Sequence, residues 1–307
     1  MKKQRILAFA VLLVALAPVR SQPPPKNDEP FDYRRFFKKP TNTKESWEAL
    51  QFELEVGRYD LAAQHLRQLL QRKPTPEELV ALHEKVGIAG FLRLRMIPRW
   101  SEDRAKDRTA RQDVESLIDQ VTAAVRAKLS DPVRIKLFIK NLFETPEERA
   151  FALRELSKSG AAAVPFLIDE LRARPEAQRG PILSAVSQFG TDTVPPLLAA
   201  LDIPNEGLRE NIIDILTRRP DFTVLRARVI DPAPFLWPLA SPLERSPLVR
   251  DAARKALVLL YDVKRPDQLP PAKEALTAEA EKYYYHKARF LDPRQVTIWR
   301  WDGMKLV

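Results

Sequence analysis

The sequence has no cysteine, few glycines and few histidines, and each shortage excludes a kind of chemistry. Without cysteine there is no disulfide bond, no thiolate nucleophile and no cysteine-ligated metal centre. The eight glycines form neither a phosphate-cradling loop nor a Gly-x-Ser-x-Gly turn around a nucleophilic serine. The three histidines, His65, His83 and His286, lack the spacing of metal ligands. We therefore expect a protein that is not an enzyme and that holds no metal ion or cofactor.

The first 21 residues are organised like a secretory signal peptide. Three basic residues precede an apolar run at residues 6–17, and Ser21 offers a small side chain for cleavage before Gln22. As a helix, this run is too short to cross the roughly 30 Å hydrocarbon core of a bilayer. We expect export to the periplasm or the exterior and no membrane span after cleavage, with retention as a membrane anchor as the alternative. Residues 22–46 are polar and proline-rich, which predicts a disordered linker.

Residues 47–100 are predicted to form a helical module in which two short helices break near Gly57. Thr75-Pro76-Glu77-Glu78 has the order of a capping box and predicts the start of a further helix. The module resembles a tetratricopeptide (TPR) repeat at Gly57, Tyr59, Ala62, Leu70 and Pro74. It departs from that family at the leading positions, which here hold Ser46, Ala49 and Leu50. The resemblance implies a hairpin of helices.

Residues 101–111 mix both charge signs and predict an exposed linker. From residue 112 to 265 we expect helix after helix, with side chains that recur at intervals of 30 residues. The recurring positions are Arg149, Arg179 and Arg209; Leu153, Leu183 and Ile213; Leu156, Val186 and Leu216; Gly160 and Gly190; Val164 and Val194; Pro165 and Pro195; Leu167 and Leu197; Leu171 and Leu201. One helical pair cannot bury so many apolar side chains, so neighbouring pairs are expected to stack. The glycines suit left-handed helix ends, and the prolines suit first helical turns.

This array resembles HEAT-repeat proteins. Residues 152–171 (ALRELSKSGAAAVPFLIDEL) are similar to a bacterial HEAT-like unit, and residues 248–257 (LVRDAARKAL) are similar to the first helix of such a unit. The third unit departs from the pattern, because Pro220 and Leu225 replace the glycine and the proline and a proline-rich loop follows. With the TPR-like module, the whole resembles large exported bacterial proteins that combine the two repeat types. The resemblance implies an α-solenoid that acts as an interaction scaffold.

Residues 266–307 are predicted to form a helix and a small β-hairpin. The helix ends on Tyr283, Tyr284 and Tyr285; residues 295–301 alternate as a strand that carries Trp299 and Trp301; and Asp302-Gly303 suits a type I′ turn. The aromatic side chains have two interpretations: they stack on sugars or bases, or they pack in a core beneath the hairpin, which is the commoner arrangement. The apolar finish at Leu306-Val307 favours a chain that continues into a longer protein.

The predicted fold is therefore all-α: an α-solenoid of HEAT-like hairpins preceded by a TPR-like helical pair, with a small C-terminal β-hairpin. We expect a non-catalytic exported scaffold with a protein or peptide partner. Its candidate interaction surface comprises Arg149, Arg179, Arg209, Tyr283, Tyr284, Tyr285, Trp299 and Trp301. The recurrent arginines either line an anion-binding face or, as HEAT proteins use this position, pack between units.

Binding of an anionic polymer, either nucleic acid or acidic polysaccharide, is the alternative function. The net charge is +10, but four of the 51 basic residues lie in the predicted signal peptide, so the excess is mild. Export argues against a genomic nucleic acid as the partner. An enzyme would need a site supplied by a missing C-terminal portion.

Overall fold

The computed structural model describes residues 39–227, 231–287 and 297–307. Residues 1–41 and residues 42–307 are separate units. The predicted signal peptide and most of the predicted proline-rich linker lie outside the described residues, although the first helix begins at Thr43, inside that linker. Where the structure describes the chain, the regular structure is helical and no β-strand forms.

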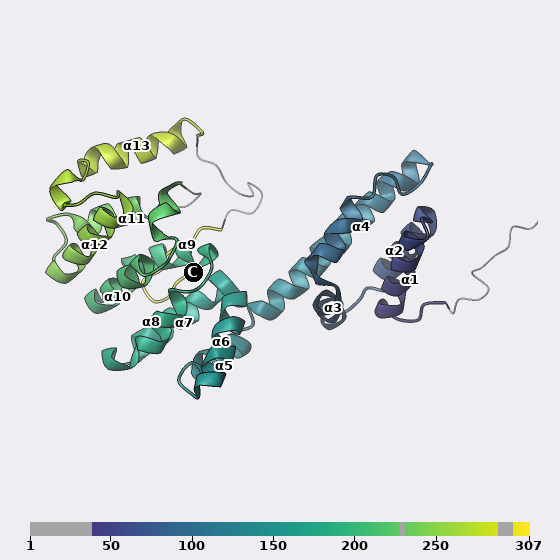
Figure 1. The fold of residues 1–307 in the computed structure, drawn as a ribbon, viewed down its shortest axis with the longest axis horizontal. Coiled ribbons are helices and arrows are strands. Elements are labelled where there is room, and N and C mark those ends of the chain that lie inside the picture. Colours follow the sequence, from purple (N-terminus) through teal and green to yellow (C-terminus); the bar gives the residue numbers. More distant parts are fainter. Residues whose placement is uncertain (1–38, 228–230, 288–296) are drawn as a thin grey trace, which may run out of the picture. The chain divides into compact units, whose positions relative to one another are not determined.

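The first hydrophobic core lies among four helices of the second unit (Figure 1). These are α1 (Thr43–Glu55), α2 (Tyr59–Gln71), α3 (Pro76–Arg95) and α4 (Arg104–Leu129). The N-caps of α1, α3 and α4 are Asn42, Thr75 and Asp103. Each side chain accepts hydrogen bonds from N–H groups of the first helical turn, which fixes the start of the helix. Gly57 has a φ of +80° and turns the chain between α1 and α2. The predicted helical hairpin and the capping box at Thr75 are confirmed.

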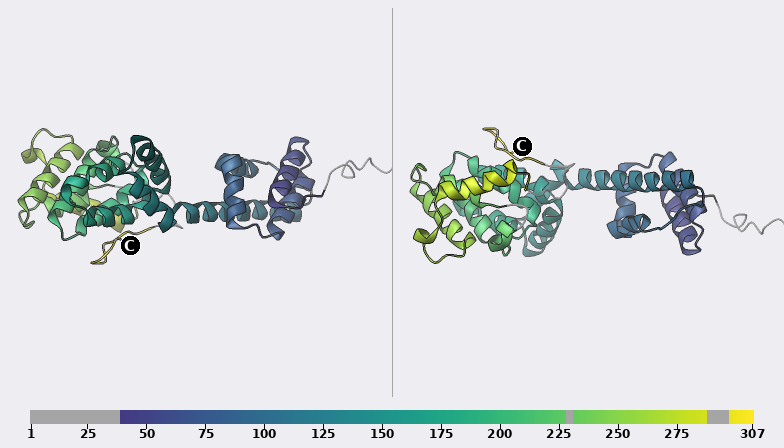
Figure 2. Two further views of the ribbon diagram at one scale, coloured as in Figure 1. Left: turned by 90° about the horizontal axis from the view of Figure 1, so that it is seen from below. Right: turned by 90° about the horizontal axis from the view of Figure 1, so that it is seen from above.

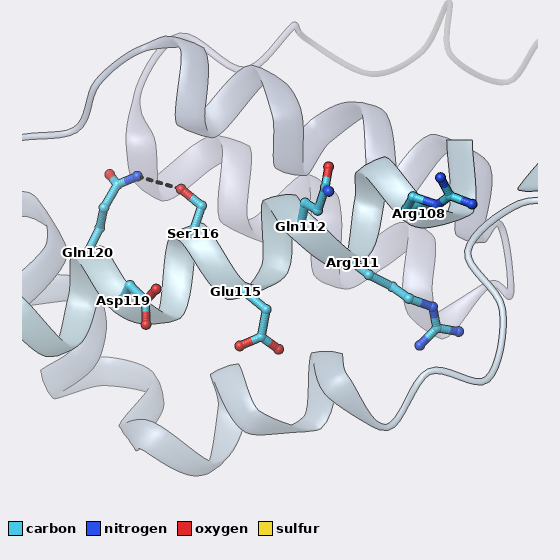
Figure 3. A pocket seen from close by; sticks show the side chains of 7 residues that line it. All are labelled: Arg108, Arg111, Gln112, Glu115, Ser116, Asp119 and Gln120. Carbon is cyan, nitrogen blue, oxygen red and sulfur yellow. Dashed lines mark hydrogen bonds between the residues drawn. The ribbon is translucent and has the colours of Figure 1, made fainter. Parts of the chain in front are cut away.

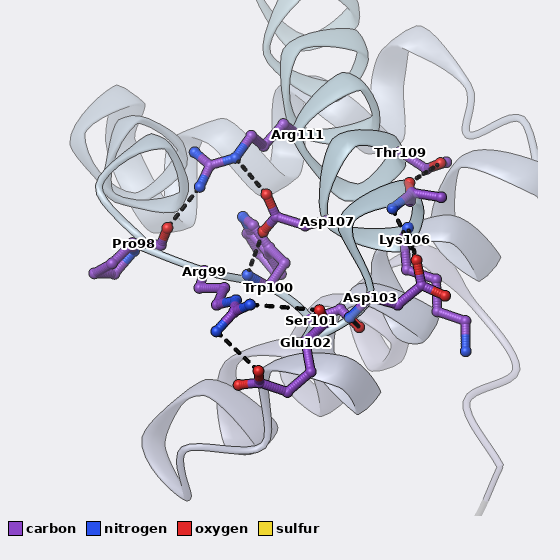
Figure 4. A network of polar contacts seen from close by, with 11 residues as sticks. Pro98, Arg99, Trp100, Ser101, Glu102, Asp103, Lys106, Asp107, Thr109 and Arg111 are labelled. Atoms are coloured by element: carbon purple, nitrogen blue, oxygen red, sulfur yellow. Dashed lines mark hydrogen bonds and ion pairs between the residues drawn. The ribbon is translucent and has the colours of Figure 1, made fainter.

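Residues 101–111, predicted as an exposed linker, are mostly exposed, but they form the turn between α3 and α4 and the start of α4 (Figure 4). α4 begins at Arg104, so most of that segment is helical. The Asp107 carboxylate accepts hydrogen bonds from Trp100 N at 2.7 Å and from Arg111 Nε at 3.0 Å. These bonds hold the pKa of Asp107 below its ordinary value. These charged side chains therefore fix the turn beside the buried Trp100.

The second hydrophobic core is built from helix pairs that follow one another along the chain (Figures 1 and 2). After α5 (Pro132–Asn141) come α6 (Pro146–Ser159) with α7 (Val164–Ala173), α8 (Gly180–Val186) with α9 (Val194–Ala199), α10 (Glu206–Thr217) with α11 (Ala233–Ala240), and α12 (Pro247–Leu260) with α13 (Ala272–Tyr284). The first helices of neighbouring pairs contact each other from α8 to α10 and from α10 to α12. Second helices do so from α7 to α9 and from α11 to α13.

The apolar residues that recur every 30 residues lie in this second core. Those that are buried include Leu156, Val186 and Leu216 in the first helices, and Val164, Val194, Leu167, Leu197, Leu171 and Leu201 in or directly after the second helices. All belong to one continuous cluster that extends from α5 to α12. Burial of the recurring positions in a shared cluster is what stacking of the pairs requires.

The proline-rich segment after α10 is helical where a loop was predicted. α11 spans Ala233–Ala240 and contains Pro238. A proline inside a helix removes one hydrogen bond. Leu236 and Trp237 of the same helix are buried in the second core, and their burial offsets that loss.

Gly160 and Gly190 were both predicted to end helices in the left-handed conformation, and the prediction is wrong for Gly190. Gly160 ends α6 with a φ of +53°, whereas Gly190 has a φ of −62°, which any residue adopts. The Asp192 carboxylate, from the next helix pair, accepts a hydrogen bond from Ala161 N at 3.0 Å. A Cβ atom on Gly160 would lie 1.9 Å from Asp192 Oδ2. Both the backbone angle and this close approach therefore require glycine at position 160.

The C-terminal β-hairpin predicted at residues 295–307 is wrong. Within the described residues 297–307, pairing amounts to an isolated antiparallel bridge between Trp301 and Leu306. Asp302 Oδ1 accepts hydrogen bonds from the N–H groups two and three residues further on, at 2.9 Å and 2.8 Å. This side chain holds four residues in a turn, and Leu306 and Val307 are too few to make a strand.

Replacing Gly160 with alanine is expected to lower the free energy of unfolding by about 2 kcal/mol, because the backbone angle disfavours a Cβ atom and Asp192 must move. The matched control is Gly207→Ala in α10, where a Cβ atom meets nothing closer than 3.6 Å. That change is expected to raise the free energy of unfolding by about 0.5 kcal/mol. Chemical denaturation followed by circular dichroism measures both. Equal effects of the two substitutions would contradict the role of Gly160.

Candidate interaction surface

Two of the three recurrent arginines bind backbone carbonyl groups that precede their own helix. Arg149, in the first turn of α6, donates from Nε to the Leu142 carbonyl oxygen at 2.8 Å. Arg179, directly before α8, donates from Nε to the Arg174 carbonyl oxygen at 3.2 Å and from Nη1 to Asn211 Oδ1 in α10 at 3.2 Å. Arg149 thus connects the end of α5 to α6, whereas Arg179 connects the ends of consecutive helix pairs. These contacts correspond to the packing interpretation of the recurrent arginine.

The third recurrent arginine, Arg209, forms a bidentate ion pair with Glu244, which lies before α12. Its Nη1 and Nη2 atoms lie 2.6 Å and 3.1 Å from the two carboxylate oxygens. The Arg209 hydrogen bond is the main reason that the pKa of Glu244 lies below its ordinary value. Glu244 also accepts a hydrogen bond from Ser246 N, the N-cap of α12. The pair therefore joins α10 to the start of α12.

The three consecutive tyrosines at the end of α13 are exposed, so the interpretation of these rings as core is wrong. The exposed fractions of Tyr283, Tyr284 and Tyr285 are 58%, 78% and 57%. Tyr284 and Tyr285 contact each other edge to face, with ring centroids 5.1 Å apart. Exposed aromatic rings offer a partner a large contact area at a low cost in side-chain entropy.

Trp299 and Trp301 lie on a different element, which we call the tail (residues 297–307), and both are partly buried against the second core. Arg172, near the end of α7, holds the tail through two contacts. Its guanidinium carbon lies 5.0 Å from the centre of the Trp301 ring, and its Nη1 donates to the Met304 carbonyl oxygen at 2.7 Å. The predicted aromatic surface is thus divided between α13 and the tail.

Leu306 anchors the tail, since its side chain belongs to the second core and is only 5% exposed. Burial of a leucine contributes about 1.5–3 kcal/mol. A cation–π contact at an exposed site contributes about 0.5–1 kcal/mol and a hydrogen bond about 1 kcal/mol. The tail is therefore held by a few kcal/mol, which is the free energy of a weak peptide complex.

A groove of about 340 Å³ lies between α11, the end of α12 and α13. Its lining includes Trp237 and Tyr261, whose ring centroids are 5.9 Å apart and whose Nε1 and hydroxyl atoms are 3.4 Å apart. Glu274, Glu279 and Lys282 of α13 also line it, and Lys282 forms an ion pair with Glu279. Aromatic rings beside carboxylates suit a side chain with an apolar stem and a cationic head, such as lysine or arginine.

The sequence pattern gave no sign of this groove. Trp237 lies in the proline-rich segment that was predicted as a loop, and Tyr261 follows the last turn of α12. The acidic residues of α13 have the spacing of an ordinary solvated helix face. Predicting the groove would have required predicting a helix in the proline-rich segment, because α11 places Trp237 opposite α13.

A shallow hollow on α4 is lined by charges of both signs (Figure 3). Its lining residues are Arg108, Arg111, Gln112, Glu115, Ser116, Asp119 and Gln120. Arg95 of α3 forms an ion pair with Glu115, and Arg111 pairs with Asp107 one turn earlier. Charges of both signs on α4, paired in part within the helix and in part with α3, are typical of a solvated face.

The described part of the chain shows no assembled metal centre. His, Asp and Glu side chains nowhere gather there in a group of three or more that could hold a metal ion. His65 Nε2 lies 4.0 Å from Glu53 Oε1, and the His83 ring stacks with Phe91 at 6.5 Å between centroids. Among the same residues, no helix combines the length and the apolar character that crossing a bilayer requires.

Comparison with protein-family models, with curated proteins and with solved structures finds no match to this chain. The function therefore has to be argued from the helical architecture, the internal repeat and the surface features described above.

Substituting Glu244 with glutamine is expected to lower the free energy of unfolding by about 2 kcal/mol at neutral pH, because Arg209 loses a charge-assisted partner. Since the pKa of Glu244 is depressed in the fold, its contribution is present above the ordinary value of 4.5 and is lost as the pH falls through the lowered pKa. The difference between the two proteins should therefore shrink in acid. Thermal unfolding across pH measures this, with the exposed Glu274→Gln as a control. A difference that persists unchanged in acid would contradict the role of the ion pair.

Proposed function

We propose that this chain is an exported, non-catalytic scaffold of HEAT-type helical pairs with a TPR-like module at its start, and that it binds a protein or peptide. The support is architectural. Most of the recurring apolar residues are buried in one shared core, Arg179 and Arg209 connect consecutive pairs, and Arg149 connects α5 to the first pair. Because the repeating residues are used in packing, a partner would be recognised by the features that do not repeat.

The observation that carries the proposal is the groove between α11 and α13. α13 is the second helix of the last described pair and contacts α11, yet none of its residues is fully buried. Ala275 and Leu276 lie half-buried in the groove, and the three exposed tyrosines follow on the same helix. Both side chains also pack partly against the second core, so α13 covers that core incompletely and the groove beside it stays open. A peptide or partner helix laid along α13 would fill the groove.

An anionic polymer fits these features less well. Arg149, Arg179 and Arg209 are engaged in hydrogen bonds within the protein, and the groove carries carboxylates. Polymer binding predicts retention on heparin that falls steeply between low and moderate salt. The scaffold proposal predicts no such retention.

Site-specific photo-crosslinking in the producing cell tests the scaffold proposal. A photoreactive residue placed at Glu274 or at Tyr284 is expected to capture one discrete partner, because Glu274 lines the groove and Tyr284 is one of the exposed tyrosines that follow it on α13. The matched control is the same residue at Asp251, an exposed position on α12. Denaturing gels and mass spectrometry read out the products. Equal labelling from all three positions, or none from the α13 positions, would rule out this binding face.

The export part of the proposal has its own test. Intact-mass analysis of the protein recovered from the periplasm or the medium is expected to give a chain that begins at Gln22. A species that keeps residues 1–21 and remains with the membrane fraction would show that the segment is an anchor.

A further inference from the structure

We infer that the surface around Arg172 is a second peptide site, which the tail of the same chain occupies, and that a partner segment of similar chemistry binds there by displacing the tail. This inference rests on the proposed peptide-binding function, but it concerns α7 and not the groove beside α13. The partner it fits is a short turn-forming segment with an aromatic and an aliphatic side chain on the same face.

The chemistry of recognition can be read from how the tail is held. Arg172 donates to the Met304 carbonyl, which is a backbone group that any peptide possesses. The same guanidinium lies 5.0 Å from the centre of the Trp301 ring, so the site selects an aromatic ring at that position. Leu306 fills a position in the core cluster, which selects an aliphatic side chain.

The tail forms a turn that is closed by hydrogen bonds among its own residues. Asp302 accepts two backbone hydrogen bonds, and Arg300 and Val307 exchange reciprocal backbone hydrogen bonds of 2.8 Å and 2.9 Å. Trp301 and Leu306 are bridge partners, so both side chains lie on the same face of the turn. A competing segment therefore needs this short closed geometry as well as the two side chains.

The contacts also allow release. Ile298 and Met304 on the tail are 81% and 78% exposed, so much of the tail contributes no burial. Arg172 is not left without a partner when the tail departs, because Asp169 Oδ1 lies 3.5 Å from its Nη1 atom. The main free-energy loss on release is the burial of the Leu306 side chain in the second core. An aliphatic side chain from a partner would restore that burial.

The test uses the intact protein and a fluorescein-labelled synthetic peptide with the sequence of residues 297–307. Fluorescence anisotropy compares the wild-type protein with the Leu306→Asp variant, whose tail is expected to leave its seat because a carboxylate cannot be buried there. A docked tail reduces the apparent affinity by the fraction of molecules in which the site is free. Since the tail is held by about 3 kcal/mol, we expect the variant to bind the peptide about a hundredfold more tightly than the wild type.

Two controls identify the site. Adding Arg172→Gln to the Leu306→Asp protein is expected to weaken peptide binding about fivefold, because the cation–π contact and the charge-assisted hydrogen bond are both lost. A peptide that itself carries Leu306→Asp should bind neither protein. Circular dichroism confirms that each variant is folded, and Trp301→Ala serves as the release variant if Leu306→Asp does not fold.

Equal affinity of the wild-type and release proteins, or equal binding of the two peptides, would overturn the inference and show that the tail is a permanent cover of the core. This failure is distinct from failure of the proposed scaffold function. Crosslinking at α13 without peptide binding at α7 would contradict this inference alone. Peptide binding at α7 without any crosslink at α13 would instead contradict the assignment of the groove as the partner site.

Discussion

The rest of the structure depends on shared burial of apolar side chains between consecutive helix pairs. A short helix such as α9 or α11 cannot be stable by itself, because helices of this length gain too few hydrogen bonds to offset nucleation. Their apolar residues enter a cluster that runs through the neighbouring pairs. Each pair therefore needs the next one, and this need explains why the sequence repeats every 30 residues.

Polar contacts join consecutive helix pairs within the stack. In the proposed function, a partner binds at features that these contacts do not use. Asp192 binds Ala161 N in the pair before it, and Arg209 binds Glu244 at the start of the pair after α11. Arg209 is one of the recurrent arginines, whereas Asp192 and Glu244 are not among the recurring positions. The features left over do not repeat: the groove beside α13, the exposed tyrosines, and the tail on Arg172. Binding at non-repeating features is how a repetitive scaffold can acquire a specific partner.

The repeat was predictable from sequence, because buried positions such as Leu156 and Val164 recur with a fixed spacing. The start of α3 was predictable as well, because Thr75 begins a capping box. Charge patterning predicted the exposure of residues 101–111 but not their helix, in which Asp103 caps α4 and Asp107 binds Trp100 and Arg111. The alternation of apolar and polar residues before Asp302 predicted a strand that does not form in the tail. The turn held by Asp302 includes the residues that a second strand would need for pairing. The candidate surface was only partly predictable: Trp301 and the tyrosines were named, but Trp237, Tyr261 and Arg172 act through contacts between segments far apart in sequence.

Hydrogen exchange on a Leu197→Ala variant tests the shared burial most directly. Leu197 of α9 is fully buried, and its truncation is expected to cost about 2–5 kcal/mol. If neighbouring pairs stabilise one another, amide exchange should rise in α8 and α9 and also in α7 and α10, while α1 and α2 around the first core stay as protected as in the wild type. Faster exchange confined to α8 and α9 would contradict mutual stabilisation. A uniform rise from α1 to α13 would instead show that the described helices unfold as a single cooperative unit.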